Sequence, residues 1–374
     1  MSDLRRTGLY ERHVAAGAKM ADFGGWSMPI EYTGVVAEHT AVRGGVGVFD
    51  VSHMGKVRVH GPGALAALNR VLTNDLGRIG DSAAQYTLLC RDDGGVIDDM
   101  IVYRWRDDEL FIVPNAANTA TVVDVLTRAI AGSSGGGVRV DDLSAAHGII
   151  AVQGPRSAEV LASMGLPVEH AYMTMVATTF RDAPVIVCRS GYTGERGYEL
   201  IVPSEILVET WDALMSRRDE FALERAGLGA RDTLRTEMGY PLHGQDISTQ
   251  VTPVQAGLGW AVGWEKPEFQ GRSALLAERG KPARRLRGIV SLERAIPRPH
   301  MSAFTIGPAE ATGELVGDVT SGTFSPSLRQ GIGLALLDSS IAVDDELLID
   351  VRGRLSRFRV VTPPFVPSSV KGDG

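Results

Sequence analysis

GGVIDDMIVY, residues 94–103, is the stretch of this 374-residue sequence that says most about its fold. Its apolar residues predict a strand over Val96–Trp105, and the Asp-Gly pair in the short loop before it predicts a hairpin with Ala83–Cys90. A second polar turn at 106–108 predicts a hairpin with Glu109–Asn115. The stretch is therefore predicted to be the middle strand of two consecutive hairpins.

Two adjacent carboxylates, Asp98 and Asp99, lie inside this predicted strand. Because successive strand residues point to opposite faces, we expect one of the two carboxylates to point toward a covered face, where it needs hydrogen bonds or a function. If the second hairpin turns about Asp107, its register puts Asp99 opposite Asn115 on one face, which suits a polar pocket. The alternative is a solvated strand face with an acid beside a turn.

The second candidate segment is GYTGERGYEL at 191–200, in which three glycines within seven residues indicate a tight loop. Tyr192 and Tyr198 offer flat faces for stacking. Glu199 lies in the strand that is predicted to follow, and a carboxylate can accept two parallel hydrogen bonds from a planar amidine-like edge such as that of a pterin ring. A plain hairpin with a cross-strand charge is the alternative.

The third segment, GLGARDTLR at 227–235, leads into a helix predicted over Arg231–Met238. Arg231 and Arg235 are four residues apart and share a helix face. We expect Arg231 at the helix start, where the helix dipole disfavours a positive side chain, and this placement favours an anionic or carbonyl partner. Surface ion pairs with Asp232 and Glu237 are the alternative.

The composition excludes several classes of protein. A net charge of −7 provides no overall field that would attract nucleic acid or an anionic membrane. No apolar run approaches the roughly 18 residues of a membrane span, and the N-terminus has no apolar signal core. Cys90 and Cys188 match no metal or disulfide spacing, so a reducing, cytoplasmic location is expected, and no metal site is predicted.

Elsewhere the sequence predicts mixed helices and strands up to a linker at Leu276–Pro282, and the length favours two or three domains. SSGGG at 133–137 is predicted to be a surface loop. The chain then becomes rich in strands. These are predicted at Leu286–Ser291, Gly317–Val319, Gly331–Leu337, Leu347–Val351 and Phe358–Val361.

The three segments belong to a collinear set of motifs that covers nearly the whole chain and resembles the T-protein family of the glycine cleavage system. One such motif is weak evidence, whereas the ordered set is very specific. The other members are ADFGGWSMP at 21–29, FDVSHMG at 49–55, VPNA at 113–116, QGP at 153–155, TSGTFSP at 320–326 and PFVP at 364–367.

The resemblance implies an α+β fold, the three-lobed cloverleaf folate-binding aminomethyltransferase fold with a C-terminal β-barrel. Residues 1–279 would form the folate-binding module as two interleaved α/β lobes, and residues 283–367 would form the barrel domain. The implied reaction moves the methylene of an aminomethyl group from the lipoyl arm of H-protein to tetrahydrofolate. Its products are 5,10-methylenetetrahydrofolate, ammonia and dihydrolipoyl H-protein. No metal, nucleic acid or membrane takes part.

The resemblance also implies roles for single residues. Asp99 matches the family's catalytic acid, close to the folate nitrogen that attacks the carbon, and could act as a general base or stabilise a cationic intermediate. Glu199 and Arg231 match residues that hold the pterin and neighbouring groups. Lys371 stands in a stretch where several relatives place an aromatic residue or an arginine, and it is a candidate contact for the glutamate tail of folate. The positions that line the folate site are matched by Met54, Tyr86, Asn115, Tyr172, Tyr192 and Tyr240.

Two other activities occur on the same fold. Folate-binding relatives that support iron–sulfur cluster assembly carry a Lys-Gly-Cys-x-x-Gly-Gln motif, and the corresponding stretch here, KPEFQGR at 266–272, has no cysteine. A stand-alone folate-dependent demethylase is the other alternative. Such an enzyme would accept a free methylated sulfonium or amine without a carrier protein.

Overall fold

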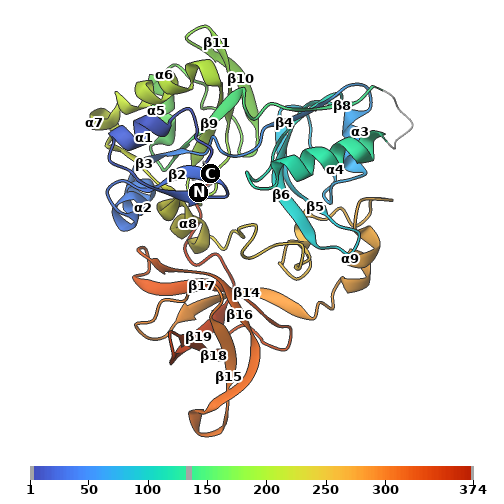
Figure 1. Cartoon of the computed structure of the whole chain (residues 1–374), viewed down its shortest axis with the longest axis vertical. Coiled ribbons are helices and arrows are strands. Elements are labelled where there is room, and N and C mark those ends of the chain that lie inside the picture. The colour runs from blue at the N-terminus through green and yellow to red at the C-terminus, as the bar shows by residue number, and fades with distance from the viewer. Residues whose placement is uncertain (1–3, 132–136, 372–374) are drawn as a thin grey trace. The chain divides into compact units, whose positions relative to one another are not determined.

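The computed structural model describes residues 4–131 and 137–371, which divide into two compact units. Unit 1 contains the residues up to Thr87, Asp98–Asp232 and the C-terminal residues from Ser369 onward. Unit 2 contains Leu88–Ile97 and Thr233–Ser368. Figure 1 traces both along the chain. The surface loop predicted at 133–137 falls almost entirely outside the described residues.

A five-stranded antiparallel sheet contains the GGVIDDMIVY stretch, with the strand order β5-β6-β7-β4-β8. The predicted register is confirmed, because Ile101 pairs with Val113 and the same register brings Asp99 level with Asn115. The helices α3 and α4 lie along this sheet (Figure 1). The elements are β4 (Val57–His60), α3 (Ala64–Asn69), β5 (Ala83–Cys90), β6 (Val96–Arg106), β7 (Glu109–Val113), α4 (Thr119–Ala131) and β8 (Arg139–Asp142).

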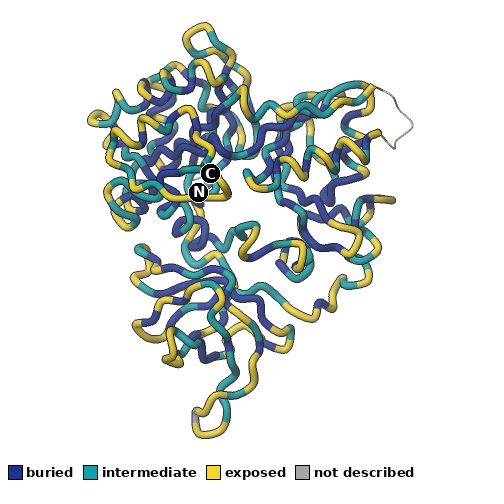
Figure 2. Tube along the Cα trace, in the orientation of Figure 1, coloured by how far each residue is buried: buried dark blue, intermediate teal, exposed yellow. Residues whose placement is uncertain are grey.

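The second sheet of unit 1 has six strands in the order β10-β11-β12-β9-β3-β13. Its strands β3 and β9 are buried at nearly every position, as is usual for strands covered on both faces (Figure 2). The helices α5 and α6 contact β12, and α2 contacts β3. The elements are α2 (Val35–Gly44), β3 (Val46–Asp50), β9 (His147–Gln153), α5 (Ser157–Ser163), β10 (Met175–Phe180), β11 (Ala183–Cys188), β12 (Gly197–Pro203), α6 (Ser204–Met215) and β13 (Leu223–Arg225).

Shorter elements complete unit 1 and connect it to unit 2. The β1 and β2 strands form a separate two-stranded sheet near the N-terminus. The helix α8 crosses the boundary between the units at Asp232. The elements are α1 (Tyr10–Ala15), β1 (Lys19–Phe23), β2 (Trp26–Glu31), the 3-10 helix η1 (Leu76–Arg78), α7 (Arg218–Phe221) and α8 (Leu228–Glu237).

Unit 2 contains a closed barrel with the strand order β14-β17-β16-β15-β18-β19, and β19 returns to pair with β14. Alternate residues such as Ile289, Phe358 and Val360 fill its interior. The sequence predicted five of these strands but missed β15, and β16 is far longer than predicted. The strands are β14 (Arg284–Ser291), β15 (Ser302–Ile306), β16 (Thr312–Ser325), β17 (Gln330–Asp338), β18 (Glu346–Val351) and β19 (Arg354–Val361).

The predicted linker at Leu276–Pro282 is wrong in its first part, because residues 276–278 end the helix α9 (Arg272–Glu278). Leu275 on this helix is buried, and Glu278 accepts hydrogen bonds from Thr252 and Gln255. These contacts tie the helix into unit 2. Unit 2 also has two 3-10 helices, η2 (Gly259–Ala261) and η3 (Pro308–Glu310).

A buried ion pair lies in unit 2 at the end of α8. The Nη1 atom of Arg235 donates to Oδ2 of Asp246 at 2.7 Å, and the two side chains are 3% and 0% exposed. Asp246 also accepts hydrogen bonds from the hydroxyls of Thr320 and Ser321 and from the amide of Leu242. Arg235 is therefore a buried residue. The alternative interpretation, in which it forms a surface ion pair, is wrong.

We predict that Asp246→Ala lowers the stability of the protein by about 3–5 kcal/mol, because it leaves the Arg235 guanidinium buried without its counter-charge. Urea denaturation followed by circular dichroism measures this loss. Asp212→Ala is the matched control, since it removes an Arg–Asp pair whose side chains are 45% and 48% exposed. Equal effects of the two substitutions on the urea midpoint would contradict the account.

Candidate active site

One amide side chain binds both acids of strand β6. The Nδ2 atom of Asn115 lies 2.8 Å from Oδ1 of Asp98 and 2.9 Å from Oδ1 of Asp99. Asp98 is fully buried and accepts two further hydrogen bonds, from the backbone amide of Asn115 at 3.0 Å and from Nδ2 of Asn118 at 2.7 Å. The alternative of a solvated strand face is therefore wrong for Asp98.

Asp99 is the more accessible of the two acids, and its Oδ2 accepts a hydrogen bond from the Tyr86 hydroxyl at 3.0 Å. Burial, together with the charge of Asp99, raises the pKa of Asp98 to about 8, although its amide donors oppose the shift. Burial and the nearby Asp99 also raise the pKa of Tyr86 well above its usual value, so Tyr86 stays a hydrogen-bond donor. Asp99 is thus the carboxylate that a ligand can reach.

The loop that carries Tyr192 is shaped by the buried side chain of Gln153 at the end of β9. Gln153 Nε2 donates to the carbonyls of Ser190 and Tyr198, at the two ends of the loop, at 3.1 and 3.2 Å. A Cβ atom at Gly191 would lie 2.0 Å from Gln153 Oε1, and one at Gly197 would lie 2.4 Å from Gln153 Cδ. Two of the three glycines of the motif are therefore required by the close approach of Gln153.

Glu199 on β12 is held by a chain of hydroxyl groups. Its Oε2 accepts a hydrogen bond from Ser190 Oγ at 2.5 Å. Because the Ser190 hydroxyl donates to Glu199, the buried Tyr103 hydroxyl must donate to Ser190, and these two oxygens are 2.9 Å apart. Tyr103 lies on β6, so these two hydrogen bonds connect the two sheets of unit 1.

Arg231 packs against the ring of Tyr192, with its guanidinium carbon 4.9 Å from the ring centroid. Burial lowers the pKa of Arg231, whereas the nearby Glu199 and Tyr192 oppose this shift. Its Nη1 atom is buried and has no hydrogen-bond partner among the described residues. A buried N–H group of this kind favours an anionic or carbonyl ligand group.

The predicted position of Arg231 at the start of its helix needs a correction. The helix α8 begins at Leu228, three residues earlier than predicted, so Arg231 ends the first turn. A Cβ atom at Gly227 would lie 2.2 Å from the carbonyl oxygen of Ile30 on β2, and one at Gly229 would lie 2.7 Å from Cγ2 of Val35 at the start of α2. The two glycines therefore allow the start of α8 to pack closely against both elements.

The structure brings most of the predicted site residues together in unit 1. Tyr86, Asp99 and Asn115 form one group through hydrogen bonds, and Tyr192 packs against Arg231, whose pKa the nearby Glu199 influences. The contacts above do not include three further predicted residues. Met54 is half-buried and accepts a hydrogen bond at its carbonyl from Lys56 Nζ, Tyr172 is half-buried before β10, and Tyr240 belongs to unit 2, where Arg235 binds its backbone.

Sequence reasoning missed several residues that position this site. Asn118 lies three residues after Asn115, just before α4, and this spacing was a signal for it. Gln153 was named only as part of a motif, and no local pattern identified Ser190 or Tyr103. Lys371, the candidate tail contact, has an exposed side chain and accepts a hydrogen bond at its carbonyl from Arg189.

No group of three His, Cys, Asp or Glu side chains within residues 4–131 and 137–371 could hold a metal ion. Over the same ranges, no helix is long and apolar enough to cross a membrane.

Family models match both parts of the chain. The GCVT N-terminal domain matches residues 9–266, and the glycine cleavage T-protein C-terminal barrel domain matches residues 284–367. The fold and the site thus define a protein of the class that joins a GCVT domain to a T-protein barrel.

Similar proteins identify the family. An aminomethyltransferase of Parafrankia sp. (strain EAN1pec) is 57% identical over 372 residues, which cover 99% of this chain and all of the relative. One of Mycobacterium tuberculosis (strain H37Rv) is 52% identical over 96% of each chain. The crystal structure of glycine cleavage system aminomethyltransferase T from Bartonella henselae has a TM-score of 0.90 at 33% identity and covers 98% of this chain and 99% of its own.

The chain belongs to the glycine cleavage T-protein family, the aminomethyltransferases of the glycine cleavage system. The predicted family and activity are confirmed. The predicted mixed helix-and-strand fold with a C-terminal β-barrel is also confirmed.

His53, next to Met54, adds a pH-dependent contribution to stability. Burial lowers its pKa from the usual 6.5 to about 4; Asp50 opposes this shift, and Arg231 and Lys56 reinforce it. His53 is therefore neutral in the folded protein at pH values where the unfolded chain binds a proton. The stability that it contributes is present above pH 6.5 and is lost as the pH falls toward 4.

We predict that His53→Gln reduces the loss of unfolding free energy between pH 7 and pH 4.5 by about 2 kcal/mol, since the substitution removes this proton uptake. Urea titrations of wild type and variant at both pH values measure it. His300→Gln, which changes an exposed histidine of unit 2, serves as the control. The same pH dependence in wild type and His53→Gln would contradict the prediction.

Proposed function

We propose that this aminomethyltransferase moves the methylene of a lipoyl-bound aminomethyl group on H-protein to tetrahydrofolate, giving 5,10-methylenetetrahydrofolate and ammonia. The observation that carries the proposal is the accessible Asp99 carboxylate, which Tyr86 and Asn115 hold by hydrogen bonds in the unit that also contains Glu199. We further propose residues 1–279 as the folate-binding module and 283–367 as the barrel domain. The cytoplasmic location remains a prediction.

The chemistry of the site fits a pterin. The Glu199 carboxylate, held by Ser190, would accept two hydrogen bonds from the amidine-like edge of the ring. The buried Nη1 of Arg231 would donate to a carbonyl or anionic group of the substrate. The aromatic rings of Tyr86 and Tyr192 offer apolar faces to the ring system. The remaining proposed folate contacts are Met54, Asn115, Tyr172 and Tyr240.

Asp99 would act where the methylene is transferred. The reaction breaks the bonds of this carbon to the lipoyl sulfur and to the amine nitrogen, and it forms two bonds to folate nitrogens. The two protons that the folate nitrogens lose end on the thiol and on ammonia. An ionised Asp99 can accept such a proton or stabilise the positive charge that develops at the carbon. Hydrogen bonds from Tyr86 and Asn115 fix the position of the Asp99 carboxylate in either role.

The choice of substrate rests on the family. H-protein as the carrier is proposed because the relatives are aminomethyltransferases and the Bartonella henselae protein is described as part of the glycine cleavage system. No contact in the described residues favours the demethylase or the iron–sulfur alternative. We therefore propose a single reaction.

We predict that Asp99→Asn lowers kcat about 100- to 1,000-fold while tetrahydrofolate still binds, because asparagine preserves the shape but not the charge. The assay follows methylenetetrahydrofolate formation from aminomethyl-loaded, lipoylated H-protein. Asp92→Asn, in the exposed turn of the same hairpin, is the matched control. Absence of turnover by wild type with active H-protein would refute the proposed function, and an active Asp99→Asn would refute the role of the acid.

We predict that Glu199→Ala instead raises the Kd for tetrahydrofolate about 10- to 100-fold, because it removes the charged acceptor of the pterin edge. Anaerobic isothermal titration calorimetry measures this affinity. Glu205→Ala, an exposed glutamate at the start of α6, should bind as wild type does. Unchanged affinity in Glu199→Ala would place the pterin away from this carboxylate.

A further inference from the structure

The C-terminal segment Ser369–Lys371 binds the loop that carries Tyr192, although some 170 residues separate them in the chain. The Ser369 amide donates to the carbonyl of Gly194 at 2.8 Å, and its hydroxyl donates to Oε2 of Glu195. Arg189, just before the loop, donates through Nη2 to the Lys371 carbonyl at 3.0 Å. The segment therefore contacts the apex of the loop, at Gly194 and Glu195, and also Arg189, which precedes the loop.

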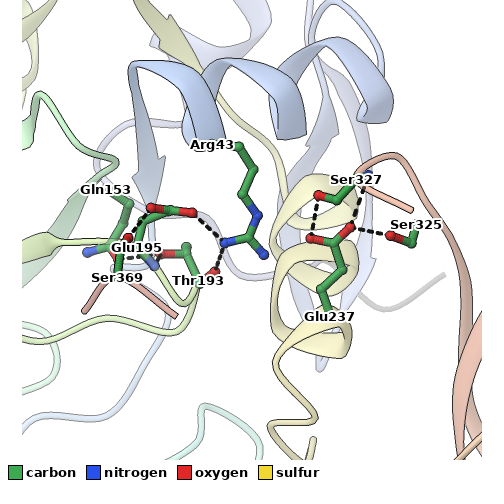
Figure 3. Close-up of polar contacts among 8 residues, drawn as sticks. All are labelled: Arg43, Gln153, Thr193, Glu195, Glu237, Ser325, Ser327 and Ser369. Carbon is green, nitrogen blue, oxygen red and sulfur yellow. Dashed lines mark hydrogen bonds and ion pairs between the residues drawn. The ribbon is translucent and has the colours of Figure 1, made fainter. Parts of the chain in front are cut away.

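A second side chain binds the other carboxylate oxygen of Glu195. Arg43 on α2 donates through Nη1 to Oε1 of Glu195 at 2.8 Å and to the carbonyl of Thr193 at 2.7 Å (Figure 3). The side chains of Arg43 and Glu195 are 15% and 10% exposed, so solvent screens this pair less than a surface pair. Glu195 thus joins an arginine of α2 to a serine of the C-terminal segment.

These contacts complement those of Gln153. Gln153 fixes the two ends of the loop and the Thr193 hydroxyl, whereas Arg43 and Ser369 fix the apex at Gly194 and Glu195. Figure 3 shows the bonds of Gln153 to Thr193 and of Arg43 and Ser369 to Glu195. Tyr192, the residue that packs against Arg231, lies between these two sets of anchors. Loosening the apex would leave the backbone around Tyr192 held by Gln153 alone, without disturbing the strands on either side.

We propose that Arg43, Glu195 and Ser369 form a C-terminal latch that positions Tyr192 for folate. This inference rests on the proposed function, because only a folate site lined by Tyr192 would sense the latch. The three are positioning residues, and none needs to touch the substrate. Without the latch, folate binding must also order the loop, so the affinity falls while the reacting groups at Asp99 are unaltered.

The test compares wild type with Ser369→Ala and Glu195→Gln in steady-state kinetics with loaded H-protein. The latch predicts that KM for tetrahydrofolate rises about tenfold, as expected for a partly buried hydrogen bond to a charged group, and that kcat changes less than twofold. Ser369→Thr, which keeps the hydroxyl, should restore the wild-type KM. Ser302→Ala, which removes a serine–aspartate bond in the barrel, is the matched control.

Hydrogen exchange provides a readout that does not depend on activity. In Ser369→Ala, the amides of residues 191–197 should exchange faster, while those of β9 and β12 keep their wild-type rates. A wild-type KM and wild-type loop exchange in Ser369→Ala would overturn the latch. If wild type does not turn over, the proposed function is wrong. Faster exchange of the loop amides in Ser369→Ala would still show that the latch holds the loop.

Discussion

The site depends on how strand β6 accommodates two adjacent carboxylates in a largely buried position. Asp98 is fully buried, and burial together with the charge of Asp99 raises its pKa to about 8, so its carboxyl group must find hydrogen-bond partners inside the protein. The solution is a set of amide donors from the end of β7 and the start of α4, which binds Asp98 and, through the same Asn115 side chain, also Asp99. The accessible acid is therefore fixed by the register of a hairpin, and a slip of one residue would turn it to the opposite face.

The same strand also fixes the second half of the site. Asp99 and Tyr103 are four residues apart on β6 and so share a face. Tyr103 donates to Ser190, and Ser190 donates to Glu199 on the other sheet of unit 1. The proposed catalytic acid and the proposed pterin carboxylate are thus connected through one strand and two hydroxyl groups. Gln153 then constrains the Gly191–Gly197 loop so tightly that only glycine fits at both ends.

Local patterns in the sequence predicted the features that depend on neighbouring residues, such as turns and the register of hairpins. The Asp-Gly loop predicted the first hairpin, and the polar turn at 106–108 predicted the second hairpin and the pairing of Asp99 with Asn115, because turn length sets register. The start of α8, the end of α9 and strand β15 were missed or misplaced, since packing against distant residues decides them. For the same reason, the sequence did not predict the roles of Gln153, Ser190 and Tyr103. The hydrogen bonds from Gln153 to Ser190 and from Tyr103 to Ser190 join residues at least 37 positions apart. Only the bond from Ser190 to Glu199 is shorter in sequence. Tetrahydrofolate is proposed as the ligand from the family resemblance rather than from any local pattern.

The most direct test of the central claim is a crystal structure of the protein with tetrahydrofolate bound. We expect the pterin edge on the Glu199 carboxylate, a carbonyl or anionic group of the substrate on Arg231, and a folate nitrogen within hydrogen-bonding distance of Asp99. Folate bound elsewhere, or bound in unit 1 with Asp99 and Glu199 both untouched, would contradict the central claim.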